Sequence, residues 1–158
     1  PTLPEVEQSL AVVDSYLIGP TGDKLTKAPE VPFRALDALP FILPAAPNGL
    51  RTALDAVARQ QHLKLGAVIE ADSLPLQRSL VATERLYTVL PIHAVWSEVQ
   101  DGRLQASKIV DPPFQRTVAM ASAKSKGPTR AVSAVAAQIV KIVDGMAKAG
   151  MWRPRLKA

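Results

Sequence analysis

The sequence contains no cysteine, which excludes disulfides, thiolate metal sites and thiol nucleophiles. It has no run of about 18 apolar residues, the length that a membrane-spanning helix requires. The N-terminal segment PTLPEVEQ is neither basic nor apolar enough for a secretory signal. The lack of cysteine is compatible with a reducing compartment. We therefore expect a cytoplasmic protein that has no membrane partner.

Recognisable catalytic motifs are also missing. The two histidines, His62 and His93, are isolated, and a lone histidine is more often a packed or surface residue than a base. Glycine-rich phosphate loops, a His-Glu-x-x-His zinc motif and a Gly-x-Ser-x-Gly nucleophile turn are absent from the sequence. Glu70, Asp72 and Asp111 do not form a paired-carboxylate pattern. We expect no enzymatic activity, no cofactor and no bound metal.

What the sequence does contain is typical of a globular chain. Its 158 residues are 47% hydrophobic, enough to bury at least one sizeable core. The net charge is +5, but the basic residues are scattered apart from two groups, Lys124, Lys126 and Arg130, and Arg153, Arg155 and Lys157. Neither group is interleaved with stacking aromatic residues. We interpret them as solvated surface rather than a nucleic-acid interface.

Residues 39–91 form two consecutive strand–loop–helix patterns. In the first, an apolar strand over residues 40–43 runs into a proline-rich loop, and Asn48 is a plausible N-cap for the next helix. In the second, a strand over residues 65–70 is followed by Asp72 or Ser73 as the cap. The spacing predicts a buried face on each helix, with Leu50, Leu54, Val57 and Ala58 on the first and Leu76, Leu80 and Val81 on the second.

Further strands and helices flank these two patterns. We predict strands over residues 10–18, 85–90, 104–110 and 115–122, a helical turn over 33–37, a helical stretch over 92–99 and a long amphipathic helix from Thr129 to Gly150. This alternation favours an α/β fold with a largely parallel sheet. The strands over 10–18 and 115–122 lie outside the block from about Pro40 to Pro113, as a two-stranded hinge would.

Three segments carry a resemblance to a known family: LPFILPAAPNGLRTALD, VIEADSLPLQRSLVA and YTVLPIHAVWSEVQDGRLQASKIVDPPFQRTVAMA. Their order and spacing resemble the effector-binding domain of LysR-type transcriptional regulators, and the last segment resembles the nitrogen-assimilation-control subgroup. The resemblance covers roughly Leu10 to Leu156. It departs from the family at Thr83-Glu84-Arg85, where family members usually place glycine.

The resemblance implies a type 2 periplasmic-binding-protein-like α/β fold. Residues 23–113 would form a nearly complete second lobe with three αβα layers and a mostly parallel sheet. Residues 1–22 and 114–158 would form an incomplete first lobe that contains the two crossing strands and the C-terminal helix. The family's N-terminal winged helix-turn-helix and the start of its first lobe have no counterpart in these residues, which implies an N-terminally truncated sensor fragment. DNA would be contacted only through the missing N-terminal domain of a parent protein.

The resemblance also implies that the two loops bind a small effector. The candidate effector contacts are Pro44, Ala45, Asn48, Gly49, Arg51, Ser73 and Leu74. Gly49 would let a ligand approach the backbone, and Arg51 could pair with a carboxylate or sulfate. Asn48 and Ser73 could equally be simple N-caps and Arg51 a solvated side chain, and the sequence leaves these alternatives open.

Three functions are compatible with these observations. The first is an effector-sensing, dimerising domain of a LysR-type regulator that binds a small, anionic metabolite and works through rearrangement of lobes and subunits. The second is a solute-binding transport component with the same fold. The third is an interaction fragment without a ligand, in which the apolar stripe of the helix beginning at Thr129 drives self-association. A homo-oligomer is expected for the first and the third.

Overall fold

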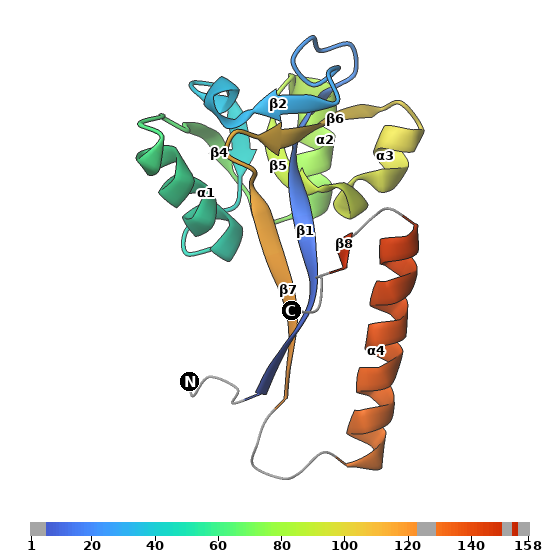
Figure 1. Cartoon of the computed structure of the whole chain (residues 1–158). Coiled ribbons are helices and arrows are strands. Elements are labelled where there is room, and N and C mark those ends of the chain that lie inside the picture. Colours follow the sequence, from blue (N-terminus) through green and yellow to red (C-terminus); the bar gives the residue numbers. More distant parts are fainter. Residues whose placement is uncertain (1–5, 123–128, 150–152, 155–158) are drawn as a thin grey trace. The chain divides into compact units, whose positions relative to one another are not determined.

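The computed structural model describes residues 6–122, 129–149 and 153–154. The predicted helix end at Gly150 and the basic residues Lys124, Lys126, Arg155 and Lys157 lie outside this part of the chain. The elements are, in order, β1 (Val6–Pro20), β2 (Glu30–Pro32), the 3-10 helix η1 (Phe33–Leu36), β3 (Phe41–Leu43), α1 (Gly49–Gln60), β4 (Ala67–Glu70), α2 (Leu74–Glu84), β5 (Thr88–Pro91), the 3-10 helix η2 (Ile92–Ala94), α3 (Trp96–Gln100), β6 (Leu104–Val110), β7 (Gln115–Ser122), α4 (Arg130–Lys148) and β8 (Arg153–Pro154). Figure 1 shows them along the chain.

Contacts divide the chain into two compact units. One consists of residues 1–13 and 115–158, and the other of residues 14–114. The N-terminal division falls inside the continuous strand β1, whereas the sequence places that joint at the Gly/Pro turn near residue 22. That these units correspond to the two lobes of the family stays a prediction.

The larger unit is built on a mixed sheet. Its strands follow the order β2-β6-β1-β5, in which β1 is antiparallel to both neighbours and β2 is parallel to β6. The parallel pair β3 and β4 forms a second sheet. It adjoins β5 through a parallel bridge between Phe41 and Tyr87. The fold is α/β with helices on the sheets, as predicted, but the main sheet is mixed and not largely parallel, because β1 lies at its centre and runs antiparallel to both β5 and β6.

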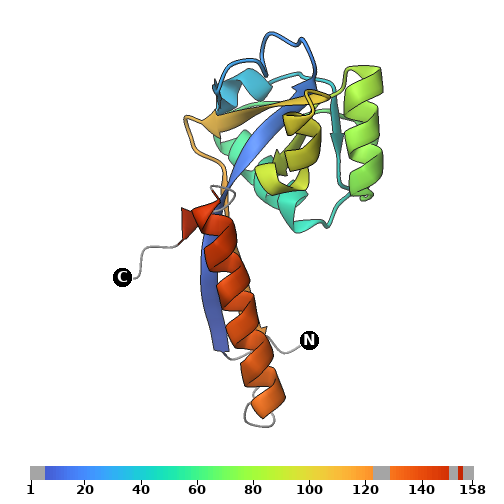
Figure 2. The same cartoon turned by 90° about the vertical axis from the view of Figure 1, so that its right-hand side faces the viewer.

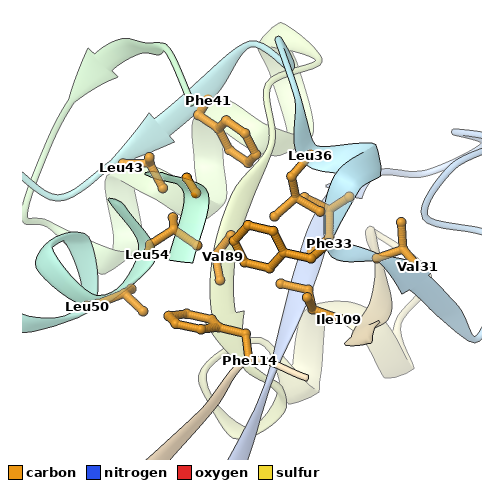
Figure 3. Packing of buried hydrophobic residues seen from close by; sticks show 12 residues of the cluster. Val31, Phe33, Leu36, Phe41, Leu43, Leu50, Leu54, Val89, Ile109 and Phe114 are labelled. Atoms are coloured by element: carbon orange, nitrogen blue, oxygen red, sulfur yellow. The ribbon is translucent and has the colours of Figure 1, made fainter. Parts of the chain in front are cut away.

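The core of the larger unit lies between α1, η1 and the sheet (Figure 3). Phe33 and Phe114 meet edge to face with ring centroids 6.2 Å apart, an arrangement that aromatic quadrupoles favour. Leu50, Leu54 and Ala58 of α1 are buried here, so the predicted apolar face of the first helix is confirmed. A second cluster lies on the α2 side around Ile42 and Val81.

The prediction for the face of α2 was partly wrong. Leu76 is 45% exposed, while Gln77 and Val81 are the buried residues of the helix. The polar side chain of Gln77 occupies the position four residues before Val81, where the apolar pattern gave no reason to place it. The helix is therefore rotated away from the face that Leu76 would define.

The turn after α2 keeps a left-handed conformation without glycine. Arg85, one of the three residues at the departure from the family pattern, has φ of 54° and caps the helix. The strand that was predicted to start at this residue therefore starts later, at Thr88.

In the smaller unit, α4 runs lengthwise beside β1 and β7 (Figures 1 and 2). Its N-cap is Thr129, whose side chain accepts from the N–H of Val132. Val143 is buried, but Val132, Val135 and Ile142 are 48%, 60% and 62% exposed. Among the described residues, no helix has both the length and the apolar character needed to cross a membrane.

Candidate functional site

Two neighbouring parallel strands end side by side in the larger unit. Leu43, the last residue of β3, lies opposite Glu70, the last residue of β4, and the N–H of Ala71 donates to the carbonyl of Leu43 at 2.9 Å. The first loop (residues 44–48) and the second loop (residues 71–73) therefore leave the sheet at the same edge. Each loop leads directly into the N-terminus of a helix, the arrangement in which open α/β sheets bind ligands.

The first loop is held by its own backbone and by the cap of α1. The carbonyl of Ala45 accepts from the N–H of Asn48 at 3.0 Å, and Asn48 Oδ1 accepts from the N–H of Leu50 at 2.9 Å. Pro44 is buried, Ala45 is half-buried, and Gly49 is exposed as the first residue of α1. Asn48 is thus an N-cap, and the exposed backbone at Gly49 leaves room for a ligand to approach.

The second loop ends at a weaker cap. Ser73 Oγ accepts from the N–H of Leu76 at 3.5 Å, at the outer limit of hydrogen-bond distance. Ser73 and Asp72 are both exposed, and it is Ser73 that caps α2. The cap uses the hydroxyl as an acceptor, so its proton can be donated to a ligand. Leu74 is half-buried against the cluster around Val81 and supports the loop from below.

Arg51 links the first loop to the last residue of β4. Its Nη1 donates to Glu70 Oε1 at 2.8 Å and to the Pro44 carbonyl at 3.3 Å, and its Nε donates to Asp55 Oδ2 at 2.9 Å. The side chain is 15% exposed. Burial by itself would lower the pKa of Arg51, but the hydrogen bonds and charges of Glu70 and Asp55 outweigh it and raise that pKa. The guanidinium is therefore a fixed cation between the first loop and the end of β4, and binding of an external anion by Arg51 stays a prediction.

Sequence reasoning missed one residue of this region. Gln77 is 2% exposed, and its Nε2 donates to the carbonyl of Ala71 at 2.6 Å. Its Oε1 accepts from the hydroxyl of Thr88, at 3.2 Å. The signal in the sequence was that Gln77 lies four residues before Val81 and so on the same face of the helix. A polar side chain that is buried on such a face needs hydrogen-bond partners.

The two histidines lie away from the two loops in the sequence. His62 is exposed and follows the C-cap of α1 with φ of 57°. His93 is half-buried in η2, and burial lowers its pKa. In the described part of the chain, no group of three or more His, Asp or Glu side chains could hold a metal ion.

A separate groove of about 430 Å³ runs between α2, α3 and the start of β6. It is lined by Pro75, Arg78, Ser79, Ala82, Thr83, Glu98, Arg103 and Leu104. Arg78 and Glu98 form an ion pair at 2.9 Å across it. None of the predicted site residues lines this groove.

Solved structures share the fold. The regulatory domain of CcmR from Synechocystis PCC6803, in complex with 2-PG, superposes with a TM-score of 0.78 at 19% identity over 92% of this chain and 72% of that one. The effector-binding domain of QuiR, in complex with shikimate, gives 0.73 at 14% identity over 89% and 66%. HinK, a LysR family transcriptional regulator from Pseudomonas aeruginosa, gives a TM-score of 0.71 at 18% identity. The match covers 87% of this chain and 48% of HinK, so this chain spans about half the length of that regulator.

The sequence itself decides the family. No curated protein matches it significantly. Residues 6–143, however, match the family described as the LysR substrate binding domain, which is more than half of the chain. This match does not favour the alternative of a solute-binding transport component. The chain belongs to the LysR substrate-binding domain family and is an effector-sensing regulatory domain with the type 2 periplasmic-binding-protein-like fold.

Proposed function

We propose that this domain senses a small anionic metabolite at the two loops that follow β3 and β4. The observation that carries the proposal is the pairing of two helix N-termini at one sheet edge, fixed by the register of Leu43 opposite Glu70. Free backbone N–H groups and the positive ends of two helix dipoles both favour an anion at such a place. The solved complexes of related folds with 2-PG and with shikimate support a small metabolite as the effector class.

Each predicted contact has a defined role in this proposal. Ser73 donates its hydroxyl proton to the anion, and the exposed backbone of Gly49 allows close approach. Arg51 supplies the positive charge by exchanging Glu70, which is 52% exposed, for the effector. Asn48, Pro44, Ala45 and Leu74 shape the rim. The domain itself carries out no catalysis.

Calorimetry of the chain against a panel of small anions that includes 2-PG and shikimate tests this proposal. We expect Ser73→Ala and Arg51→Ala each to weaken binding of the best anion about tenfold or more, since a charged hydrogen bond contributes roughly 1.5–3 kcal/mol. Ser79→Ala on α2 and Arg59→Ala on the last turn of α1 are the matched controls. Binding that neither Ser73→Ala nor Arg51→Ala changes would rule out this site.

We also propose that the domain forms a homo-oligomer in a longer cytoplasmic regulator that controls transcription. Its DNA contacts would come from a winged helix-turn-helix in another part of that regulator. On α4, Val132, Val135, Ile139, Ile142 and Met146 repeat at alternating intervals of three and four residues, the spacing of a helix–helix seam. The exposure of Val135 and Ile142 supports an interface there.

Light scattering, which measures the mass of the particle, and a fluorescent dye that binds exposed apolar surface together test the oligomer. We expect the chain to self-associate and Val135→Asp with Ile142→Asp to shift it toward monomer, because two charges would enter the apolar seam. Ser133→Asp, on an exposed polar position of the same helix, is the control. A wild-type monomer that binds no dye contradicts this part of the proposal.

A further inference from the structure

Gln77 is a buried amide whose hydrogen-bonding groups both have defined partners. The carbonyl oxygen of Ala71 can only accept, so the NH₂ group of Gln77 must face it across 2.6 Å. The remaining Oε1 then accepts from the hydroxyl of Thr88, which is itself fully buried. The orientation of the amide is therefore fixed from both sides.

This bond completes the restraint of Ala71. The N–H of Ala71 donates to the carbonyl of Leu43 on the neighbouring strand, and its carbonyl accepts from Gln77. Ser73, two residues further on, therefore follows a residue whose backbone N–H and carbonyl are both hydrogen-bonded. The cap bond from the N–H of Leu76 to Ser73 Oγ is long, at 3.5 Å, so the hydroxyl itself contributes little to fixing the loop. The carbonyl of Ser73 is held separately, by the backbone N–H of Gln77 at 3.0 Å, and a substitution of the Gln77 side chain keeps that bond.

The restraint extends from the loop into the sheet. Thr88 lies in β5 opposite Ile18 of β1, the strand that runs through the domain. A chain of two hydrogen bonds thus connects the second loop to the main sheet. Burying the amide of Gln77 costs free energy that an apolar side chain at the same position would not cost. We take this as a sign that the amide serves to orient the second loop.

We propose that Gln77 is a positioning residue for effector binding: it fixes the second loop so that Ser73 presents its hydroxyl to the anion. The inference rests on the proposed function and deepens it, since it assigns the geometry of the site to a side chain that does not itself touch the effector.

The experiment uses the 158-residue chain with Gln77→Met, Gln77→Glu and, as control, Val81→Ala. Val81 is buried on the same helix and belongs to the cluster against which Ala71 packs, so its truncation lowers stability and removes packing near the loop but leaves both hydrogen bonds of Gln77 in place. Amide hydrogen exchange of residues 71–74 and 76 and affinity for 2-PG and shikimate are measured for each variant. We expect Gln77→Met to raise exchange at these amides about tenfold or more and to weaken binding to a similar degree, and Val81→Ala to do neither beyond its global destabilisation.

Gln77→Glu gives a signature that a purely structural role would not produce. A protonated carboxyl can donate to the Ala71 carbonyl and a carboxylate cannot, and burial raises the pKa of such a carboxyl above its usual value of about 4.3. We expect loop exchange and affinity in this variant to approach wild type at pH 5.5 and to depart from it at pH 8, each compared with wild type at the same pH. Gln77→Met should show no such recovery.

The two proposals can fail separately. If Gln77→Met matches Val81→Ala in loop exchange, and Gln77→Glu shows no recovery at low pH, the role of Gln77 is overturned whatever binds. If the wild-type chain binds neither compound, that counts against the proposed effector chemistry. The loop exchange then still decides whether Gln77 positions the loop.

Discussion

The two strand–loop–helix segments of the larger unit follow the same sequence logic but are stabilised differently. The β3–α1 segment has a short cap bond from Asn48, an apolar face of Leu50, Leu54 and Ala58, and the external ion pairs of Arg51. The β4–α2 segment has a long cap bond from Ser73 and a buried amide, Gln77, beside Val81.

The difference suggests that the first segment is built for the stability of its helix and the second for holding a side chain toward a ligand. In α1, a short cap holds the start of the helix and a continuous apolar face packs it on the core, so the loop before it needs no bond from a buried polar side chain. In α2, a polar bond from inside the helix to its own preceding loop takes over part of this task. The second loop therefore depends more on one side chain and less on its cap, which suits a loop that has to hold a hydroxyl toward a ligand.

The largest expected contrast is between the apolar faces of the two helices. Leu54→Ala should lower the free energy of unfolding by about 2–5 kcal/mol, because Leu54 is fully buried and its truncation leaves a cavity. Leu76→Ala should cost less than about 1 kcal/mol, because Leu76 is 45% exposed. Urea unfolding measures both, and equal losses would contradict the assignment of Gln77 and Val81 as the buried face of α2.

A smaller contrast is expected between the caps. Asn48→Ala should destabilise the chain by about 1 kcal/mol, the usual effect of losing a good N-cap. Ser73→Ala should cost no more than about half of that, since its bond to Leu76 is 3.5 Å long. Thermal unfolding of the two variants at one pH provides the comparison. A larger loss for Ser73→Ala would mean that the second cap is stronger than its geometry indicates.

The smallest effect is expected where the two helices are alike. α1 is followed by His62 at φ of 57° and α2 by Arg85 at φ of 54°, both left-handed positions that glycine occupies without strain. His62→Gly and Arg85→Gly should each stabilise the chain by about 0.5 kcal/mol. Glycine relieves the backbone strain of the folded state, and the greater conformational entropy that it gives to the unfolded chain offsets part of this gain. His62→Ala and Arg85→Ala, which keep the strain, are the controls for loss of the side chain, and a gain equal to the glycine variants would refute the explanation.

Much of this architecture could be predicted from local patterns. The cap at Asn48 and the helix it starts follow from a capping residue, a glycine and an apolar repeat, all local signals. The face of α2 could not be predicted in the same way. The repeat of Leu76, Leu80 and Val81 is compatible with two rotations of the helix, and the burial of Gln77 is favourable only because the Ala71 carbonyl and the Thr88 hydroxyl lie at its ends.

The sequence by itself determined most of the strands and helices in their order, the two capped loops and, through its match over residues 6–143, the family, but it gave no sign of the short strands β2 and β8. These depend on near neighbours in the chain and on the identity of successive residues. Only the tertiary structure decided that the guanidinium of Arg51 lies between Glu70, Asp55 and the Pro44 carbonyl, and that Gln77 connects Ala71 to Thr88. Such contacts join residues from different elements, and their geometry exists only after the sheet and helices have packed.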